Sequence, residues 1–154
     1  MVDWELLLSK AITVAATAHA GQKDKAHKPY ILHPLRVMMK MEDTPSRVIA
    51  ILHDVLEDSG DYDEQYFLEE FGEWTLEVLK LLTHKRGQPY DEYIKNLLKD
   101  RTARGVKLAD LEDNIDPGRL PVVTEKDLKR IEKYHRAMQV IKEANRNAWL
   151  EENR

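Results

Sequence analysis

Hydrophobic residues recur every three or four positions along most of this chain, which is the spacing of amphipathic helices. The first segment shows the pattern at Leu7, Ala11, Val14 and Ala18, with Asp3 placed ahead of it as an N-cap. The same spacing predicts helices over residues 3–19, 34–41, 63–71, 74–82, 90–98, 104–114 and 124–150, and one that begins at 44–46 and runs into 53–58. No segment alternates as a strand does, so we predict an all-α, single-domain helical bundle over residues 1–154.

Length and composition narrow the functional class. The chain has 154 residues, enough for one core, and no run of about eighteen apolar residues that would predict a membrane span. It contains no cysteine, which excludes disulfides and thiolate ligands, and we predict a soluble cytoplasmic protein. A net charge of −4 without a basic stripe argues against a nucleic acid polymer as partner, whereas a small phosphorylated ligand remains compatible.

The segment HDVLED, residues 53–58, concentrates ionisable groups directly after the apolar run VIAIL. A helix advances about 100° per residue, which places the apolar side chains on one face and the ionisable ones on the other. The ionisable face carries His53, Asp54, Glu57 and Asp58. A solvated acidic helix surface would look the same, so the function of this segment depends on what other segments bring to it.

Two other segments carry matching groups. In PYILHP, His33 stands directly ahead of the helix expected from Pro34, and we expect the proline to hold His33 outside that helix. In VKLADLEDN, Lys107, Asp110 and Asn114 share one helix face. We therefore predict a divalent metal site with two imidazole and two carboxylate ligands from His33, His53, Asp54 and Asp110. A bound cation would offset the clustered carboxylates, and Glu57 and Asp58 are the candidate catalytic residues that position and deprotonate an attacking water.

The ordered motifs AHAGQ, PYILHP, HDVLED and VKLAD resemble the hydrolase domain of the RelA/SpoT-like branch of the HD metal-dependent phosphohydrolases, and in particular its small stand-alone members. This resemblance implies a helical bundle of the HD-domain type and a metal ion, usually Mn²⁺, at the four ligands named above. It also implies removal of pyrophosphate from the 3′ position of guanosine tetraphosphate or pentaphosphate. The expected substrate-binding residues are Lys23, Lys25, Lys107 and Asn114.

Two positions depart from that resemblance and keep other functions open. Asp24 stands where the alarmone hydrolases usually carry a guanine-stacking arginine, and His27 stands where glycine is common. The alternatives are an HD-type phosphatase of another nucleotide and a nucleotide-binding module that has lost catalysis. The charged last helix can pack on the bundle or on a second copy of the chain, and the sequence does not separate a monomer from a homo-oligomer.

Overall fold

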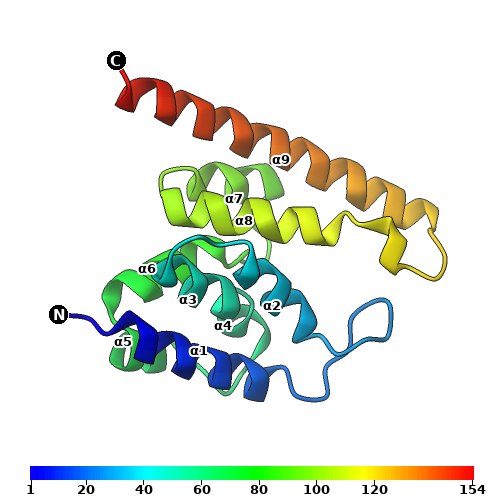
Figure 1. The fold of residues 1–154 in the computed structure, drawn as a ribbon. Helices are drawn as coiled ribbons and strands as arrows, with labels where there is room; N and C mark the ends of the chain where they lie inside the picture. The colour runs from blue at the N-terminus through cyan, green and yellow to red at the C-terminus, as the bar shows by residue number, and fades with distance from the viewer.

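The computed structural model describes residues 1–154 as α-helices joined by short loops (Figure 1). The elements are α1 (Trp4–Ala18), α2 (Leu32–Met39), α3 (Thr44–Leu52), α4 (Val55–Asp58), α5 (Glu64–Phe71), α6 (Glu73–Leu82), α7 (Tyr90–Leu97), α8 (Arg101–Asn114), the short 3₁₀ helix η1 (Pro117–Arg119) and α9 (Glu125–Glu152). Extended pairing is limited to an isolated bridge between Lys23 and Pro29. The predicted all-α class is confirmed.

Aspartate N-caps explain where four of the α-helices begin. The carboxylates of Asp3, Asp43, Asp63 and Asp100 each accept a hydrogen bond from the backbone N–H three residues further along, at 2.7–3.0 Å. Thr124 opens α9 with a reciprocal capping box. Because Asp100 caps α8, that helix begins at Arg101, three residues before the predicted start at 104.

The prediction of one continuous helix through residues 53–58 is wrong. The helix α3 ends at Leu52 and α4 begins at Val55, so His53 and Asp54 lie in a turn between two helices. The ring Nδ1 of His53 lies 2.7 Å from the carbonyl oxygen of Ala50, the group that a continuing helix would use for the amide of Asp54. A local side-chain hydrogen bond thus replaces one step of the backbone ladder.

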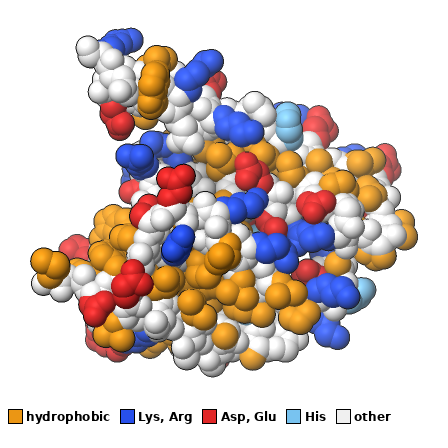
Figure 2. Space-filling view, viewed as in Figure 1, with side chains coloured by type: hydrophobic (Ala, Val, Ile, Leu, Met, Phe, Trp, Pro, Cys, Tyr) orange, Lys and Arg blue, Asp and Glu red, His pale blue; other side chains and the backbone are white.

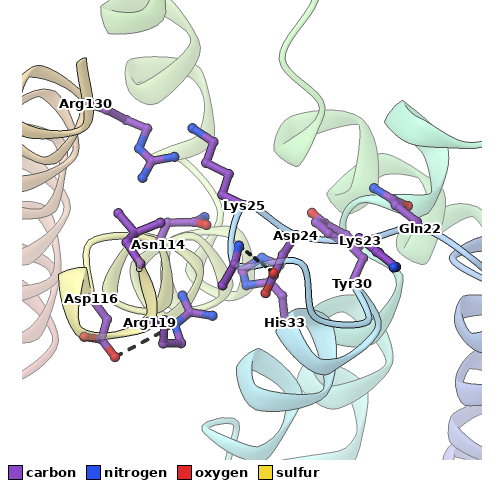
Figure 3. A pocket seen from close by; sticks show the side chains of 12 residues that line it. Gln22, Lys23, Asp24, Lys25, Tyr30, His33, Asn114, Asp116, Arg119 and Arg130 are labelled. Carbon is purple, nitrogen blue, oxygen red and sulfur yellow. Dashed lines mark hydrogen bonds and ion pairs between the residues drawn. The ribbon is translucent and has the colours of Figure 1, made fainter. Parts of the chain in front are cut away.

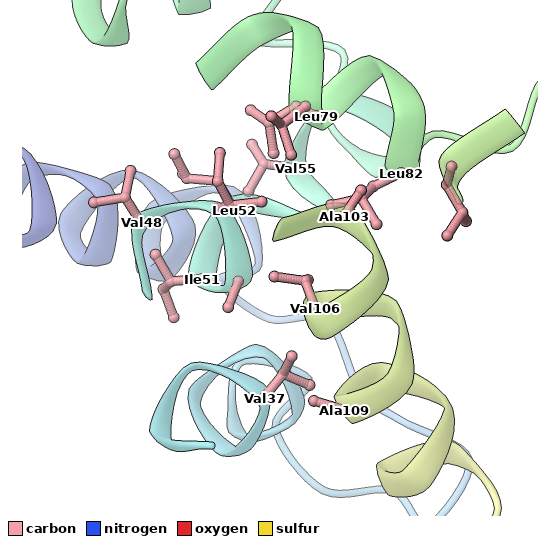
Figure 4. Packing of buried hydrophobic residues seen from close by; sticks show 14 of the residues in the cluster. Val37, Val48, Ile51, Leu52, Val55, Leu79, Leu82, Ala103, Val106 and Ala109 are labelled. Carbon is pink, nitrogen blue, oxygen red and sulfur yellow. The ribbon is translucent and has the colours of Figure 1, made fainter. Parts of the chain in front are cut away.

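The core surrounds α3 on all sides. The five residues from Val48 to Leu52 have no exposed surface. Helices α1 and α2 pack against α3, α8 packs against α2, α3 and α6, and α9 lies along α8 (Figure 1). Figure 4 shows side chains of α3 meeting those of α8, with Val37 of α2 and Leu79 of α6 on either side. The central position of α3 fixes the place of the turn that follows it.

No helix is both long and apolar enough to cross a membrane. The longest, α9, has 28 residues and carries charged side chains along much of its length.

Truncation of Leu52 tests this packing. We expect Leu52→Ala to lower the free energy of unfolding by about 3 kcal/mol, because it removes fully buried methyl groups and leaves a cavity. Urea unfolding followed by circular dichroism measures the change. Val140→Ala is the control, since Val140 is 43% exposed on α9 and should change stability by less than about 0.5 kcal/mol. Equal losses in both variants would contradict the proposed central role of α3.

Candidate metal centre and active site

The structure brings the four predicted ligands together from three segments: α2, the turn between α3 and α4, and α8. Nε2 of His33 lies 3.0 Å from Oδ1 of Asp110, and Nε2 of His53 lies 3.1 Å from Oδ2 of Asp54. The crossed distances are 3.6 Å from His33 to Asp54 and 3.5 Å from His53 to Asp110. Ligand atoms of His33, His53 and Asp54 all lie within 4.8 Å of one another. His33, His53 and Asp54 therefore have the spacing of a single metal site, and Asp110 faces both imidazole rings from α8.

His33 does not stand outside the helix, as we had expected from Pro34. It lies in the first turn of α2, which begins at Leu32. Proline is tolerated in a first turn because its missing N–H would have no partner there. The side chain of His33 is thus held by the helix rather than by an extended segment before it.

Each histidine uses one ring nitrogen for support and leaves the other facing the centre. Nδ1 of His53 bonds the carbonyl oxygen of Ala50, which can only accept, so Nδ1 carries the hydrogen and Nε2 of the neutral ring keeps a lone pair. Nε2 of His53 is buried and forms no hydrogen bond, because its neighbours at 3.1 and 3.5 Å are oxygens of Asp54 and Asp110 that can only accept. A buried imidazole nitrogen without a hydrogen bond, next to carboxylates, is typical of a metal ligand. The two imidazoles and two carboxylates together fit a divalent cation.

The electrostatics of the centre favour positive charge. Burial opposes the charged form of both rings, but the facing carboxylates raise the pKa of His33 and of His53 above the ordinary value. Burial likewise opposes ionisation of Asp54, yet the charge of His53 holds the pKa of Asp54 at about 2. The carboxylates therefore stay ionised, and the space between the rings is a place for a cation.

Asp113 is a supporting residue that sequence reasoning missed. Its Oδ2 lies 2.6 Å from Nδ1 of His33, and Arg36 donates to it at 2.7 and 3.0 Å. Arg119 approaches the same carboxylate at 3.3 Å. Burial works against ionisation, but the hydrogen bonds from His33 and Arg36 lower the pKa of Asp113 well below its usual range. The only sequence signal was its position three residues after Asp110 on the same helix.

Asp110 and Asp54 are also held by neighbours. Lys107 donates to Oδ2 of Asp110 and Asn114 donates to Oδ1, both at 2.7 Å. Tyr30, another residue missed in the sequence, donates its hydroxyl to Asp54 at 2.5 Å. The two predicted substrate contacts on α8 therefore also orient a carboxylate of the centre.

The two candidate catalytic carboxylates take different positions. Glu57 is exposed at the rim of the centre and lines a cavity with His53 and Asp54. Asp58 is also exposed and lies near Gln22. Partial desolvation, together with the charge of Asp54, raises the pKa of both carboxyls. Glu57 is thus the one that shares a cavity with the centre.

Two cavities flank the four ligands. The loop cavity, about 210 Å³, is lined by His33 and by the cationic side chains Lys23, Lys25, Arg119 and Arg130 (Figure 3). The tyrosine cavity, about 200 Å³, is lined by His53, Asp54 and Asp110 and by Glu57, Tyr90, Tyr93, Lys107, Lys133 and Tyr134. Tyr30 and Asn114 line both. Figure 2 shows Lys and Arg side chains gathered across the middle of the molecular face, below α9.

The four predicted substrate-binding residues therefore all lie at these cavities, Lys23 and Lys25 at one, Lys107 at the other and Asn114 at both. Sequence reasoning did not find Arg119 and Arg130, because nothing local marks them as different from surface arginines.

Asp24 serves the loop itself. Its Oδ1 accepts hydrogen bonds from the backbone N–H groups of Ala26 and Lys28, at 2.8 and 2.9 Å. His27 adopts a φ of 61°, a left-handed conformation that glycine reaches without strain. The two departures noted in the sequence thus meet at one tight turn beside the loop cavity.

Comparison with known proteins agrees with this architecture. No family model matches the chain. The guanosine-3′,5′-bis(diphosphate) 3′-pyrophosphohydrolase of Aquifex aeolicus is 30% identical over 138 residues, covering 82% of this chain and 19% of that protein. The Haemophilus influenzae protein of the same name is 32% identical over 117 residues, covering 66% and 17%. The chain spans about a fifth of the length of these curated relatives.

A solved structure described as a metazoan ortholog of SpoT that hydrolyses ppGpp matches with a TM-score of 0.73. The sequences are 22% identical, and the match covers 88% of this chain and 84% of the other. The expected helical fold of the HD hydrolase domain is confirmed, as is the resemblance to the RelA/SpoT branch.

Metal titration tests the centre. We expect the wild-type chain to bind Mn²⁺ and His53→Gln to bind it at least about 100-fold more weakly, because the variant loses the unpartnered Nε2. Isothermal titration calorimetry on chelator-stripped protein measures both. The matched control is His135→Gln, an exposed histidine on α9. Unchanged affinity in His53→Gln would remove His53 from the centre.

The role of Asp113 has its own test. We expect Asp113→Asn to weaken Mn²⁺ binding by about 10- to 100-fold, because an amide holds the His33 ring less firmly than the carboxylate does. Metal affinity is measured by calorimetry, and circular dichroism checks that the fold is kept. A folded variant with wild-type affinity would contradict an orienting role.

Proposed function

We propose that this chain, whose fold and motif-bearing segments are those of a RelA/SpoT-type HD hydrolase domain, is a Mn²⁺-dependent 3′-pyrophosphohydrolase of guanosine 3′,5′-bis(diphosphate). The observation that carries the proposal is the convergence of His33, His53, Asp54 and Asp110 between two cavities lined with cationic side chains. The substrate is taken from the names of the relatives, and the reaction type is inferred from the geometry of the site.

The four converging side chains are the ones that would hold the cation. A divalent ion supplies Lewis-acid stabilisation of phosphoryl charge and lowers the pKa of water when it is bound. The protein's part is to fix the ligands: the contacts of Asp113, Ala50 and Lys107 hold them in place before substrate arrives. Mn²⁺ accepts imidazole and carboxylate ligands together, which matches a donor set without sulfur.

We assign to Glu57 the role of taking the proton from the attacking water, because it lines the cavity that contains His53 and Asp54. The raised pKa of Glu57 lies closer to neutral pH than the pKa of a free glutamate, which favours both the uptake and the release of a proton by this carboxylate. The water oxygen forms a bond to the phosphorus that carries the 3′ oxygen, and the bond between that phosphorus and the 3′ oxygen breaks. The proton is passed to the 3′ oxygen, and the products are GDP and pyrophosphate. Asp58, near Gln22, lines neither cavity, so we assign it only a secondary role in orienting the water.

The basic side chains match a highly charged substrate. Lys23, Lys25, Arg119 and Arg130 surround the loop cavity, and Lys107 lies beside Asp110 in the tyrosine cavity. Cations placed where phosphate charge accumulates stabilise the transition state without reorganising when the reaction occurs. A nucleotide with a diphosphate on each side of the ribose fits this distribution.

One observation favours a second candidate, a phosphohydrolase of another nucleotide. Asp24 closes the loop turn by two backbone hydrogen bonds, so the side chain where an arginine is usual is engaged within its own loop. Guanine would then lack its expected stacking partner. The metal centre and the water chemistry would be the same for either substrate.

Product analysis separates the two. We expect the chain with Mn²⁺ to release pyrophosphate and GDP from guanosine 3′,5′-bis(diphosphate), and to stop when a chelator is added. Anion-exchange chromatography of a nucleotide panel measures both products and substrates consumed. Orthophosphate released from other nucleotides, with the bis(diphosphate) untouched, would replace the first proposal by the second.

Substitution of Glu57 tests the water step. We expect Glu57→Gln to lower kcat by about 10²- to 10⁴-fold, because the amide cannot accept the proton, while Mn²⁺ affinity stays near that of the parent. Steady-state kinetics and calorimetry measure the two quantities. Glu143→Gln, an exposed glutamate on α9, is the control. A Glu57→Gln variant with parental kcat would assign the proton transfer to another group.

A further inference from the structure

The lysines of the tyrosine cavity differ in what they are bonded to. Lys107 donates to Asp110 at 2.7 Å, so its charge is matched within the protein. Lys133, which is exposed on α9 and lines the same cavity, makes no hydrogen bond and no ion pair with an acidic side chain. Its ammonium lies over two aromatic rings instead, 4.5 Å from the centroid of Tyr90 and 5.3 Å from that of Tyr134. One cation at this cavity is therefore uncommitted.

Tyr90 adds a second unused polar group. It lines the same cavity, and its hydroxyl is enclosed by protein atoms without a hydrogen-bond partner. Buried hydroxyls are nearly always bonded, because leaving one unpaired costs free energy. Its neighbour Tyr93 shows the usual state, donating to the carbonyl oxygen of Leu82 at 2.7 Å. The Tyr90 hydroxyl thus has no partner in the protein, and a ligand in the cavity could accept its hydrogen only after the surrounding side chains shift.

The position of the metal ligands orients a substrate across the two cavities. His53, Asp54 and Asp110 line the tyrosine cavity, whereas only His33 of the four lines the loop cavity. A phosphate at the centre would therefore have Lys133 and Tyr90 on one side of it and the loop cavity on the other. Helix α9 provides a cation to each side, with Arg130 at the loop cavity and Lys133 one turn further along.

We infer that Lys133 and Tyr90 bind the terminal phosphate of a diphosphate whose inner phosphate lies at the metal centre. This inference rests on the proposed function and adds to it a determinant of specificity. Lys107, already paired with Asp110, is left to serve the inner phosphate, and Lys133 supplies the charge that a second phosphate requires. Because Lys133 contacts two aromatic rings and none of the four converging ligands, we expect the pair to favour pyrophosphate esters over monophosphates.

Binding of inorganic pyrophosphate and orthophosphate, each titrated at fixed free Mn²⁺, tests the inference on the full chain. We expect the parent to bind pyrophosphate more tightly than orthophosphate. Lys133→Met should weaken pyrophosphate binding on the order of tenfold or more and leave orthophosphate binding nearly unchanged, because it removes one charge-assisted hydrogen bond. Lys142→Met, another exposed lysine on α9 that lines neither cavity, should change neither.

Tyr90→Phe separates binding from folding. It removes a hydroxyl without a partner, so the thermal midpoint should stay the same or rise while pyrophosphate affinity falls about three- to tenfold. Pyrophosphate affinity unchanged in both variants, or equal affinity of the parent for the two anions, would overturn the inference even if the alarmone is hydrolysed. Lys133-dependent pyrophosphate binding without alarmone turnover would support it and overturn the proposed function instead.

Discussion

Two carboxylates, Asp54 and Asp110, face two imidazole rings in the space where α2, the α3–α4 turn and α8 meet. Ionised groups withdrawn from water cost several kcal/mol each unless other charges and hydrogen bonds compensate. Here the compensation comes from three separate segments, because His33 belongs to α2, His53 follows α3 and Lys107 belongs to α8. The same contacts that satisfy the carboxylates therefore also hold these helices against one another.

The rest of the bundle supports this arrangement from behind. Helix α3 has five successive residues without exposed surface, so it has no freedom to rotate and present another residue at its end. The carbonyl oxygen of Ala50 accepts a hydrogen bond from Nδ1 of His53. This contact ends α3 and turns Nε2 of the ring towards the metal centre. The packing of α3 therefore contributes both to the stability of the bundle and to the position of the His53 ring.

Much of the fold could be predicted because its signals are local. The N-cap at Asp3, the cap at Asp63 with Gly72 closing α5, and the Thr124 capping box each act within four residues or at one end of a helix. The break after Leu52 could not be predicted, because it depends on a side-chain bond that helical periodicity does not encode. The early start of α8 was missed because no apolar residue precedes Ala103 in that turn.

The candidate site divides in the same way. Its four converging residues stand in short motifs of chemically suited types, so residue identity and order were enough to select them. Tyr30, Asp113, Arg119 and Arg130 gain their roles only from contacts between segments far apart in the chain, such as the 2.6 Å bond from Asp113 to His33 across 80 positions. Asp58 is a carboxylate in the expected motif, so the sequence predicts a role in catalysis. In the structure it lies near Gln22 and does not line the tyrosine cavity.

The docking of α9 along α8 has a mechanical consequence. Helix α9 carries both Arg130 and Lys133. Further along, the buried side chains of Ala137, Met138 and Ile141 anchor this helix to the bundle. A substitution at that anchor would shift Arg130 and Lys133 together, because both belong to the same helix. Ala137, Met138 and Ile141, which line neither cavity, thus help to set the positions of both cations.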